Sequence, residues 1–250
     1  MRVLLRVAYD GTNYHGWQRQ ENAVTIESVL TEELSKVLKE DIELIGASRT
    51  DAGVHALGNV AVFDTNTTIP AEKICFAVNQ GLPSDIRVVE SEEVAADFHP
   101  RYAECVKTYE YMISNEKIYN PLNRLYSYGV YYPLDVEKMQ AAAKHFIGEH
   151  DFAGFCSAGS QVKSTVRTIF DIQVESSGTE ICIRVTGNGF LYNMVRIIAG
   201  TLVEVGKGYI SPEDIPAIID SKERRQAGPT APAHGLKLVE IRYQSKMKFK

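Results

Sequence analysis

The residues best able to do chemistry lie in one short loop, residues 46–56, which reads GASRTDAGVHA and which we call the Asp51 loop. Apolar runs at 42–45 and 60–63 flank it, and we expect both to be strands. Its glycines and other small residues allow another group to come close to the backbone. Catalytic groups are often carried on loops that a rigid scaffold holds. Asp51 is therefore a candidate catalytic carboxylate, and a tight turn with an exposed acid is an equally open alternative.

The Asp51 loop resembles, over eleven consecutive positions, the catalytic loop of the bacterial tRNA pseudouridine synthase A family. In that family the aspartate of the run Arg-Thr-Asp-Ala-Gly-Val-His is the essential residue. The resemblance therefore implies that Asp51 is the catalytic carboxylate. It also implies that Arg49 contacts phosphate or fills the space that a flipped nucleotide leaves.

Further blocks of the same resemblance spread it over nearly the whole chain, at residues 9–20, 107–111, 188–206 and 234–239. The first block carries the run Tyr-Asp-Gly…Gly-Trp-Gln-Arg-Gln. We expect Trp17, the one tryptophan of the chain, to anchor this loop on the core rather than to stack on a base. Arg19 is a candidate phosphate contact, with a solvated loop charge as the alternative.

The second block, Lys107-Thr108-Tyr109-Glu110-Tyr111, resembles the basic-x-Tyr-x-Tyr element of the family. Alternate residues of a strand point to one face, so Tyr109 and Tyr111 share a side. Such pairs most often pack against neighbouring strands. By position, Tyr109 matches the family's active-site tyrosine, which implies that it stacks on uracil, and we assign Tyr111 to the core.

Arg196 is the one cation inside residues 188–205, the most apolar stretch of the chain. A buried arginine needs an anion or several acceptors, because an unpaired buried charge is costly. The run Phe-Leu-x-x-Met-Val-Arg resembles a family motif whose arginine pairs with the catalytic aspartate. The resemblance thus implies an ion pair between Arg196 and Asp51. The alternative is a surface arginine whose stem covers apolar neighbours.

Composition argues mildly against a nucleic-acid partner, since the formal net charge is −5 and the pI is about 5.7. Net charge describes the average field, however, and charge can be segregated on the surface. Acids cluster at 32–43 and 90–97, whereas many of the arginines lie elsewhere in the sequence. A basic RNA-binding surface therefore remains compatible with this chain.

Several classes of protein are disfavoured by what the sequence lacks. It has no apolar run near the roughly 18 residues of a membrane span, and its first residues do not read as a signal peptide. The four cysteines are scattered, and we expect free, buried thiols in a cytoplasmic protein. No metal-ligand spacing occurs among the six histidines, so we expect no metal. The glycines at 11 and 16 and at 187 and 189 do not complete a phosphate-binding or dinucleotide-binding motif, so we expect no other cofactor.

The patterns of apolar residues predict the elements that must position these residues. The first half predicts strands at 2–9, 42–45, 60–63 and 85–89, with helices beginning after Thr25 and at Pro70. This order is the split β-α-β arrangement. The second half predicts a strand at 103–114, a helix at 134–147, strands at 167–174, 180–186 and 236–243, and helices within 188–205 and 211–219. The polar, glycine-rich segment 148–165 predicts a long loop, which is either functional or mobile.

The resemblance implies an α+β fold, in which two ferredoxin-like halves share one continuous, mostly antiparallel sheet with a central cleft. Residues 1–98 would form the half that carries the Asp51 loop, and residues 99–250 the half that completes the cleft and contains the dimer interface. The implied partners are tRNA and a second copy of the chain, with no membrane.

The implied reaction converts uridine to pseudouridine at positions 38, 39 and 40 of the tRNA anticodon stem-loop. Asp51 would attack the nucleotide or remove a sugar proton, and the sequence leaves both routes open. A nucleoside hydrolase is one alternative, although it needs a water activator and often a metal held by clustered acids. A non-catalytic RNA-binding module is another, and it needs a sheet and aromatic residues but no buried Asp–Arg pair.

Overall fold

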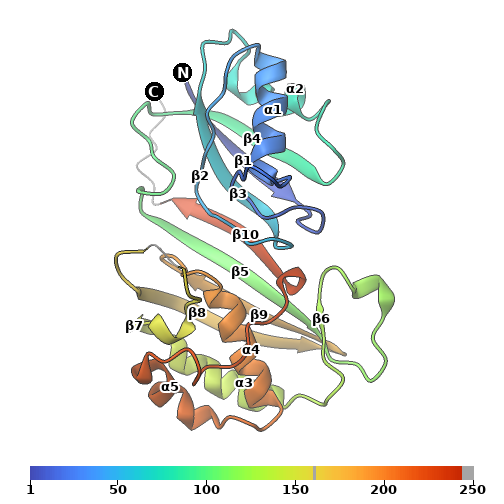
Figure 1. Ribbon diagram of the computed structural model, residues 1–250, viewed down its shortest axis with the longest axis vertical. Coiled ribbons are helices and arrows are strands. Elements are labelled where there is room, and N and C mark those ends of the chain that lie inside the picture. The colour runs from blue at the N-terminus through green and yellow to red at the C-terminus, as the bar shows by residue number, and fades with distance from the viewer. Residues whose placement is uncertain (160–161, 244–250) are drawn as a thin grey trace. The chain divides into compact units, whose positions relative to one another are not determined.

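The computed structural model describes residues 1–159 and 162–243 (Figure 1). In these residues ten strands make a large, mostly antiparallel sheet, and five α-helices accompany it. This confirms the predicted α+β class. The chain divides into two compact units, which we call the first unit (Met1–Cys105 with Leu238–Lys250) and the second unit (Val106–Lys237).

The first unit has the strand and helix order that its sequence predicts. Its elements are β1 (Arg2–Tyr9), α1 (Ile26–Leu38), β2 (Ile45–Gly46), β3 (His55–Asp64), α2 (Ala71–Val78), β4 (Ile86–Val94) and most of β10 (Leu236–Tyr243). β1 lies between β3 and β4 and is antiparallel to both, while β2 pairs with β3. This is the order of the split β-α-β arrangement. The predicted strand at 42–45 shrinks to the two residues of β2.

Helix α1 follows from local sequence. Thr25 caps it by accepting a hydrogen bond from the Ser28 amide, and the Ser28 side chain bonds back to the Thr25 amide. Ile26, Leu30, Leu34 and Leu38 repeat every four residues and are buried along one face of this helix. Helix α2 begins after Pro70, as predicted, and packs against α1 and β4.

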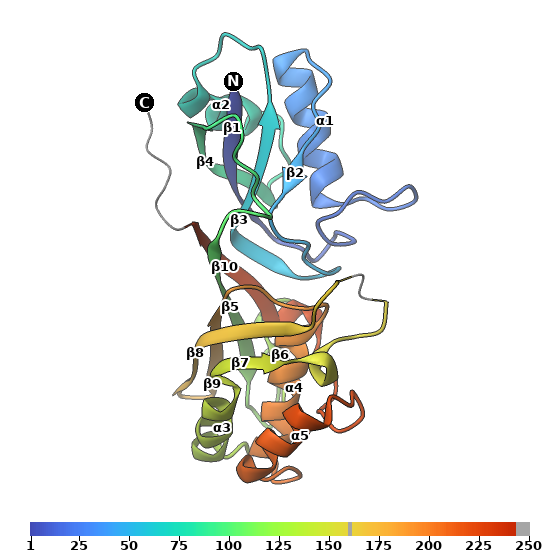
Figure 2. The ribbon, with the colours of Figure 1, turned by 90° about the vertical axis from the view of Figure 1, so that its left-hand side faces the viewer.

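Four antiparallel strands form the sheet of the second unit (Figure 2). Its elements are β5 (Cys105–Ser114), β6 (Tyr128–Gly129), α3 (Val136–Ala143), β7 (Gly148–Asp151), β8 (Val166–Ser177), β9 (Glu180–Gly187), α4 (Met194–Gly206) and α5 (Ile215–Ser221). The strand order is β5-β9-β8-β7, and β6 pairs in parallel with β5. Helix α4 is buried along nearly its whole length. A side chain at Gly200 would collide with the carbonyl of Pro229, so glycine lets the 226–235 segment run against this helix.

Some expectations need correction. The helix predicted at 134–147 spans Val136–Ala143, because Asp135 caps it by accepting from the Lys138 amide, and a tighter turn follows. The segment predicted as one long loop at 148–165 contains strand β7 and a short turn, and buried Phe152 and Phe155 anchor it. Residues 160–161 of that segment lie outside the described residues.

The cysteines and the hydropathy of the helices complete this picture. All four cysteines are free, as expected, but only Cys75 is fully buried, and the other three are half-buried. Within the described ranges, no helix is both long and apolar enough to cross a lipid bilayer.

Candidate active site

The Asp51 loop is held by the loop at residues 10–17 of the same unit. The Trp17 amide donates to the Thr50 carbonyl at 3.1 Å, and the Gly53 amide donates to the Tyr14 carbonyl at 3.3 Å. The Gly11 amide donates to Nδ1 of His55 at 3.0 Å. Three hydrogen bonds therefore join two segments that lie about 40 residues apart in the chain.

Glycine is required where these two loops meet. Gly16 adopts a φ of +84°, and a β-carbon there would stand 2.5 Å from the Thr50 carbonyl oxygen. A side chain at Gly11 would collide with the carbonyl of Val54. The glycines of the 9–20 block thus serve to bring backbone against backbone at the Asp51 loop.

Buried polar groups hold residues 48–50, in the first half of the Asp51 loop, against the sheet. The Tyr9 hydroxyl lies 2.8 Å from Oγ1 of Thr50, and Nδ2 of Asn59 donates to the Tyr9 hydroxyl at 3.2 Å and to the Ser48 carbonyl at 3.0 Å. All of these side chains are buried. Hydrogen bonds of this kind stabilise one loop conformation, since an unsatisfied buried group costs about 1–3 kcal/mol.

Trp17 is fully buried, which confirms its predicted role as an anchor. Its ring lies directly under Gly46, where a side chain would collide with the indole. Nε of Arg101 also donates to the Gly46 carbonyl at 2.8 Å. Contacts with a buried tryptophan and with an arginine therefore hold the start of the Asp51 loop in place.

The Asp51 loop leaves its chemical groups accessible. The Asp51 carbonyl accepts from the Val54 amide at 3.1 Å in a turn that Gly53 closes with a φ of +77°. Thr50 points into the core, Asp51 is half-buried and Arg49 is exposed. Arg19 is exposed as well, and its amide donates to the carboxylate of Glu27 at 2.7 Å. A rigid loop that presents an acid and an arginine can bring a carboxylate to a phosphate-bearing substrate.

In the second unit, Tyr111 and Tyr109 of strand β5 are both buried, with different neighbours. Tyr111 is fully buried, and its hydroxyl donates to the Pro232 carbonyl at 2.8 Å. Burial raises the pKa of Tyr111 well above its usual range. Its assignment to the core is confirmed. Tyr109 packs edge-to-face against Phe190, with 5.2 Å between the ring centres.

Arg196 lies in the first turn of α4 and is half-buried. Its Nε donates to the Ala231 carbonyl at 2.8 Å, and its Nη1 donates to Oδ1 of Asn193 at 2.7 Å. Nδ2 of Asn193 in turn donates to Oγ of Ser157 at 2.9 Å. The bonds to Ala231 and Asn193 thus fix the guanidinium plane, and a planar group held in one orientation is suited to two-pronged recognition of an anion.

Sequence reasoning missed Asn193, Ser157 and Ala231 as supports of Arg196. Asn193 stands inside the 188–206 block and has a φ of +62°, which asparagine tolerates better than most residues. No pattern marks Ser157 or Ala231, because their role comes from packing.

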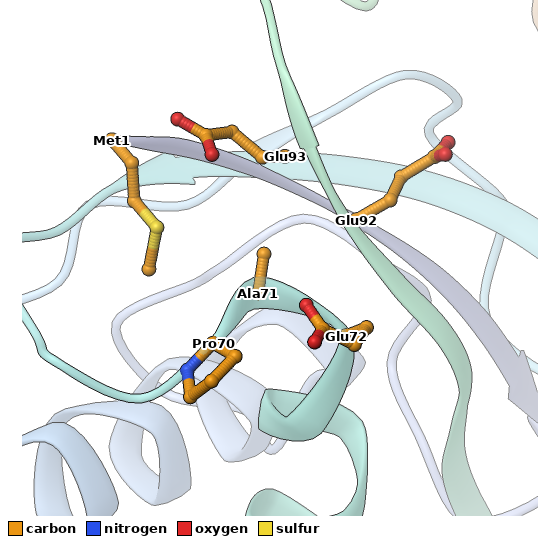
Figure 3. A pocket seen from close by; sticks show the side chains of 6 residues that line it. All are labelled: Met1, Pro70, Ala71, Glu72, Glu92 and Glu93. Atoms are coloured by element: carbon orange, nitrogen blue, oxygen red, sulfur yellow. The ribbon is translucent and has the colours of Figure 1, made fainter. Parts of the chain in front are cut away.

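The cavity in Figure 3 lies elsewhere in the first unit and has a volume of about 420 Å³. Met1, the start of α2 and strand β4 line it, with the carboxylates of Glu72, Glu92 and Glu93 among the lining groups. Burial and nearby Glu90 raise the pKa of Glu92. Three acids make this cavity unsuited to a phosphate chain. Within the described ranges, no cluster of three or more His, Cys, Asp or Glu side chains has the arrangement of a metal site.

Comparison with known proteins identifies the family. Residues 6–103 and 142–244 match the family model described as tRNA pseudouridine synthase. The tRNA pseudouridine synthase A of Thermoanaerobacter sp. (strain X514) is 51% identical over 241 residues, which cover 96% of this chain and 99% of that protein. The enzyme of the same name from Acetivibrio thermocellus is also 51% identical, with the same coverage.

A further relative, tRNA pseudouridine synthase A 2 of Clostridium tetani, is 51% identical over 244 residues, which cover 96% of this chain and 98% of that protein. Among solved structures, the archaeal box H/ACA sRNP Nop10–Cbf5 complex matches 98% of this chain and 49% of that chain, at 12% identity and a TM-score of 0.37, which is too low to support an argument. The family match and the relatives show that the chain belongs to the tRNA pseudouridine synthase family, whose members are isomerases that convert uridine to pseudouridine in tRNA.

Proposed function

We propose that the protein isomerises uridine to pseudouridine at positions 38, 39 and 40 of the tRNA anticodon stem-loop, with Asp51 as the catalytic carboxylate. The observation that carries this proposal is the Asp51 loop itself. Hydrogen bonds to the 10–17 loop and to the buried side chains of Tyr9 and Asn59 hold it, yet Asp51 remains half-buried and Arg49 exposed. Catalysis requires such a preorganised group.

The reaction breaks the N-glycosidic bond, turns the uracil, and joins C5 to C1′ of the ribose. C5 loses a proton and N1 gains one, so atoms and electrons balance without a co-reactant. Asp51 either attacks the nucleotide or removes a proton from the sugar, and both routes need an ionised carboxylate. The target uridine must leave the helical stack before the acid can reach it.

Arg196 is proposed to pair with the Asp51 carboxylate and to keep it ionised, because a nearby cation favours the charged form. The bonds from Arg196 to Ala231 and Asn193 support this role, since they fix the direction of the guanidinium. Tyr109 is proposed to stack on the uracil and to help remove the C5 proton. Its contact with Phe190 holds the ring in place.

The exposed arginines are proposed to contact the RNA backbone. Arg49 is placed next to Asp51, where it contacts phosphate or fills the space of the flipped nucleotide. Arg19 contacts phosphate at the edge of the 10–17 loop. Their exposure in this structure supports both roles.

The active form is proposed to be a cytoplasmic homodimer with RNA spanning both copies. In this proposal residues 1–98 carry the Asp51 loop, and residues 99–250 complete the cleft and supply the dimer interface. The exposed apolar side chains of Ile118, Leu122 and Tyr131 support an interface in the second part. A fully active monomer in sedimentation velocity at assay concentration would contradict the dimer.

Product analysis tests the proposed function. Unmodified tRNA is incubated with the protein and then mapped by carbodiimide modification and mass spectrometry. We expect pseudouridine at one or more of positions 38–40 and no free uracil. Free uracil would instead indicate a hydrolase, and binding without a change in the RNA would indicate a non-catalytic module.

A further inference from the structure

Arg167 of strand β8 lies against the turn that follows β9. Ile169 is in register with Gly187, and the Thr168 amide donates to Oδ1 of Asn188 at 3.0 Å while the Asn188 amide donates to the Thr168 carbonyl at 3.1 Å. These bonds fix the turn at 187–190 beside Arg167. A β-carbon on Gly189 would stand 3.7 Å from Nε of Arg167.

Arg167 is a half-buried cation that donates hydrogen bonds to backbone carbonyls. Its Nη1 donates to the carbonyls of Ser164 at 3.0 Å and Val166 at 2.6 Å, and no carboxylate of the described residues pairs with it. Burial lowers the pKa of Arg167. In the same unit Arg184 pairs with Glu110, and Arg225 pairs with Glu223. Because desolvating an unpaired charge is unfavourable, such an arginine is suited to an incoming anion.

Gly189 leaves the approach to Arg167 open. Its backbone is outside the left-handed region, and the closest atom to an added β-carbon is at an ordinary contact distance of 3.7 Å. Gly187 differs, because a β-carbon there would stand 2.7 Å from the Thr168 carbonyl oxygen. The fold therefore requires glycine at 187 but not at 189, where a methyl group would stand beside the free edge of the guanidinium.

Phe190, the residue after Gly189, connects the guanidinium of Arg167 to the candidate site. Phe190 packs edge-to-face on Tyr109, which we propose to stack on uracil. An anion bound at Arg167 would thus lie next to Gly189, one residue from the phenylalanine that packs on the proposed base-binding residue, and the anions of RNA are its backbone phosphates. We propose that Nε and Nη2 of Arg167 bind a backbone phosphate of the RNA next to the target uridine, and that Gly189 keeps this position open. The proposal rests on the proposed function.

The salt dependence of binding tests this role. Dissociation constants for tRNA are measured at several salt concentrations in an Asp51→Asn background, so that no turnover occurs. We expect Arg167→Gln to weaken binding about five- to tenfold and to reduce the slope of log Kd against log salt by about one. Arg167→Lys keeps the charge, so its slope should stay near that of the parent while part of the affinity is lost.

Two further variants distinguish phosphate binding by Arg167 from the mere loss of one positive charge. Arg225→Gln removes the same charge from an exposed arginine of the same unit and should leave the slope unchanged. Gly189→Ala should weaken binding severalfold without changing the melting temperature. An unchanged affinity and slope in Arg167→Gln, or an equal loss in Arg225→Gln, would overturn the inference while the function stood. A parent that binds no tRNA, or a wild type that forms no pseudouridine, would overturn both.

Discussion

The α-carbon of Gly16 faces the carbonyl oxygen of Thr50 so closely that a β-carbon would stand 2.5 Å from it. Thr50 is the residue before Asp51, so this contact sets the position of the candidate catalytic acid from a loop more than 30 residues away in the chain. Shape complementarity between two backbones leaves little freedom for either loop.

Gly16→Ala should therefore displace the Asp51 loop. The substitution adds both the strain of a φ of +84° and the collision with Thr50, whereas Gly208→Ala adds only strain, at a φ of +80° with no atom within 4 Å. Backbone strain of this kind costs about 1–2 kcal/mol. We expect Gly208→Ala to lose stability but keep its turnover number, and Gly16→Ala to lose more stability and at least tenfold in turnover. Equal behaviour of the two variants in thermal melts and activity assays would contradict this.

Asp51→Asn should abolish pseudouridine formation and leave tRNA affinity within about tenfold, because one carboxylate does the chemistry while many phosphate contacts supply binding. The amide has nearly the shape of the acid, so the loop should keep its structure. Single-turnover assays with excess protein and a parallel binding titration measure the two quantities. Appreciable turnover by the Asn variant would remove Asp51 from its proposed role.

Much of the fold could be predicted from the sequence where local pattern dominates. Strand β1 begins and ends where the alternation of Val3, Leu5, Val7 and Tyr9 predicts, and Thr25 caps the helix that follows. Segment 148–165 was harder, because Phe152 and Phe155 are buried and the turn at 153–155 packs against α4 and α5, which come much later in the chain. Composition alone makes such a segment look like a loop.

The candidate site could also be predicted from the sequence only in part. Resemblance pointed to Asp51, Tyr109 and Arg196, but the surroundings of each depend on tertiary packing. The contact of Gly16 with Thr50 and the bond of Arg196 to the Ala231 carbonyl join residues that lie more than 30 positions apart and that no periodicity relates. The approach of Gly189 to Arg167 depends on the register of β8 and β9, which a one-residue shift would destroy.

Cys182 should resist alkylation at neutral pH. Burial and the neighbouring carboxylate of Glu110 raise the pKa of Cys182 to about 11. At pH 8 its thiolate fraction is then about one thousandth, and the thiolate is the reactive form. We expect iodoacetamide to label Cys182 at pH 8 far more slowly in the folded protein than in urea, with the rate rising towards pH 11. In the unfolded chain the pKa of this thiol is lower, about 8.5, so the unfolded state loses the proton first. As pH rises above about 8.5, this difference lowers the free energy of unfolding. Peptide mass spectrometry measures the labelling, and equal rates in both states would contradict the shift.

The last prediction concerns Arg196. Asn193 and the Ala231 carbonyl fix its guanidinium, and we propose that the oriented group pairs with the Asp51 carboxylate within roughly 4 Å. Arg196→Ala should cost activity and stability, since it removes the cation from a carboxylate that must stay ionised. Arg196→Lys keeps the charge but loses the two-pronged geometry, and it should recover only part of the turnover.

Asn193→Ala tests orientation separately from charge, because Arg196 then keeps its cation and its bond to Ala231 but loses the bond from Nη1. If Arg196 keeps Asp51 ionised, the pH at which turnover is half-maximal should rise in Arg196→Ala, and by less in Asn193→Ala and Arg196→Lys. A merely structural arginine would lower the amount of folded protein and leave this pH unchanged. Single-turnover rates between pH 5 and 9, normalised to folded protein, decide between the two, and an unshifted profile in Arg196→Ala would return Arg196 to a structural role.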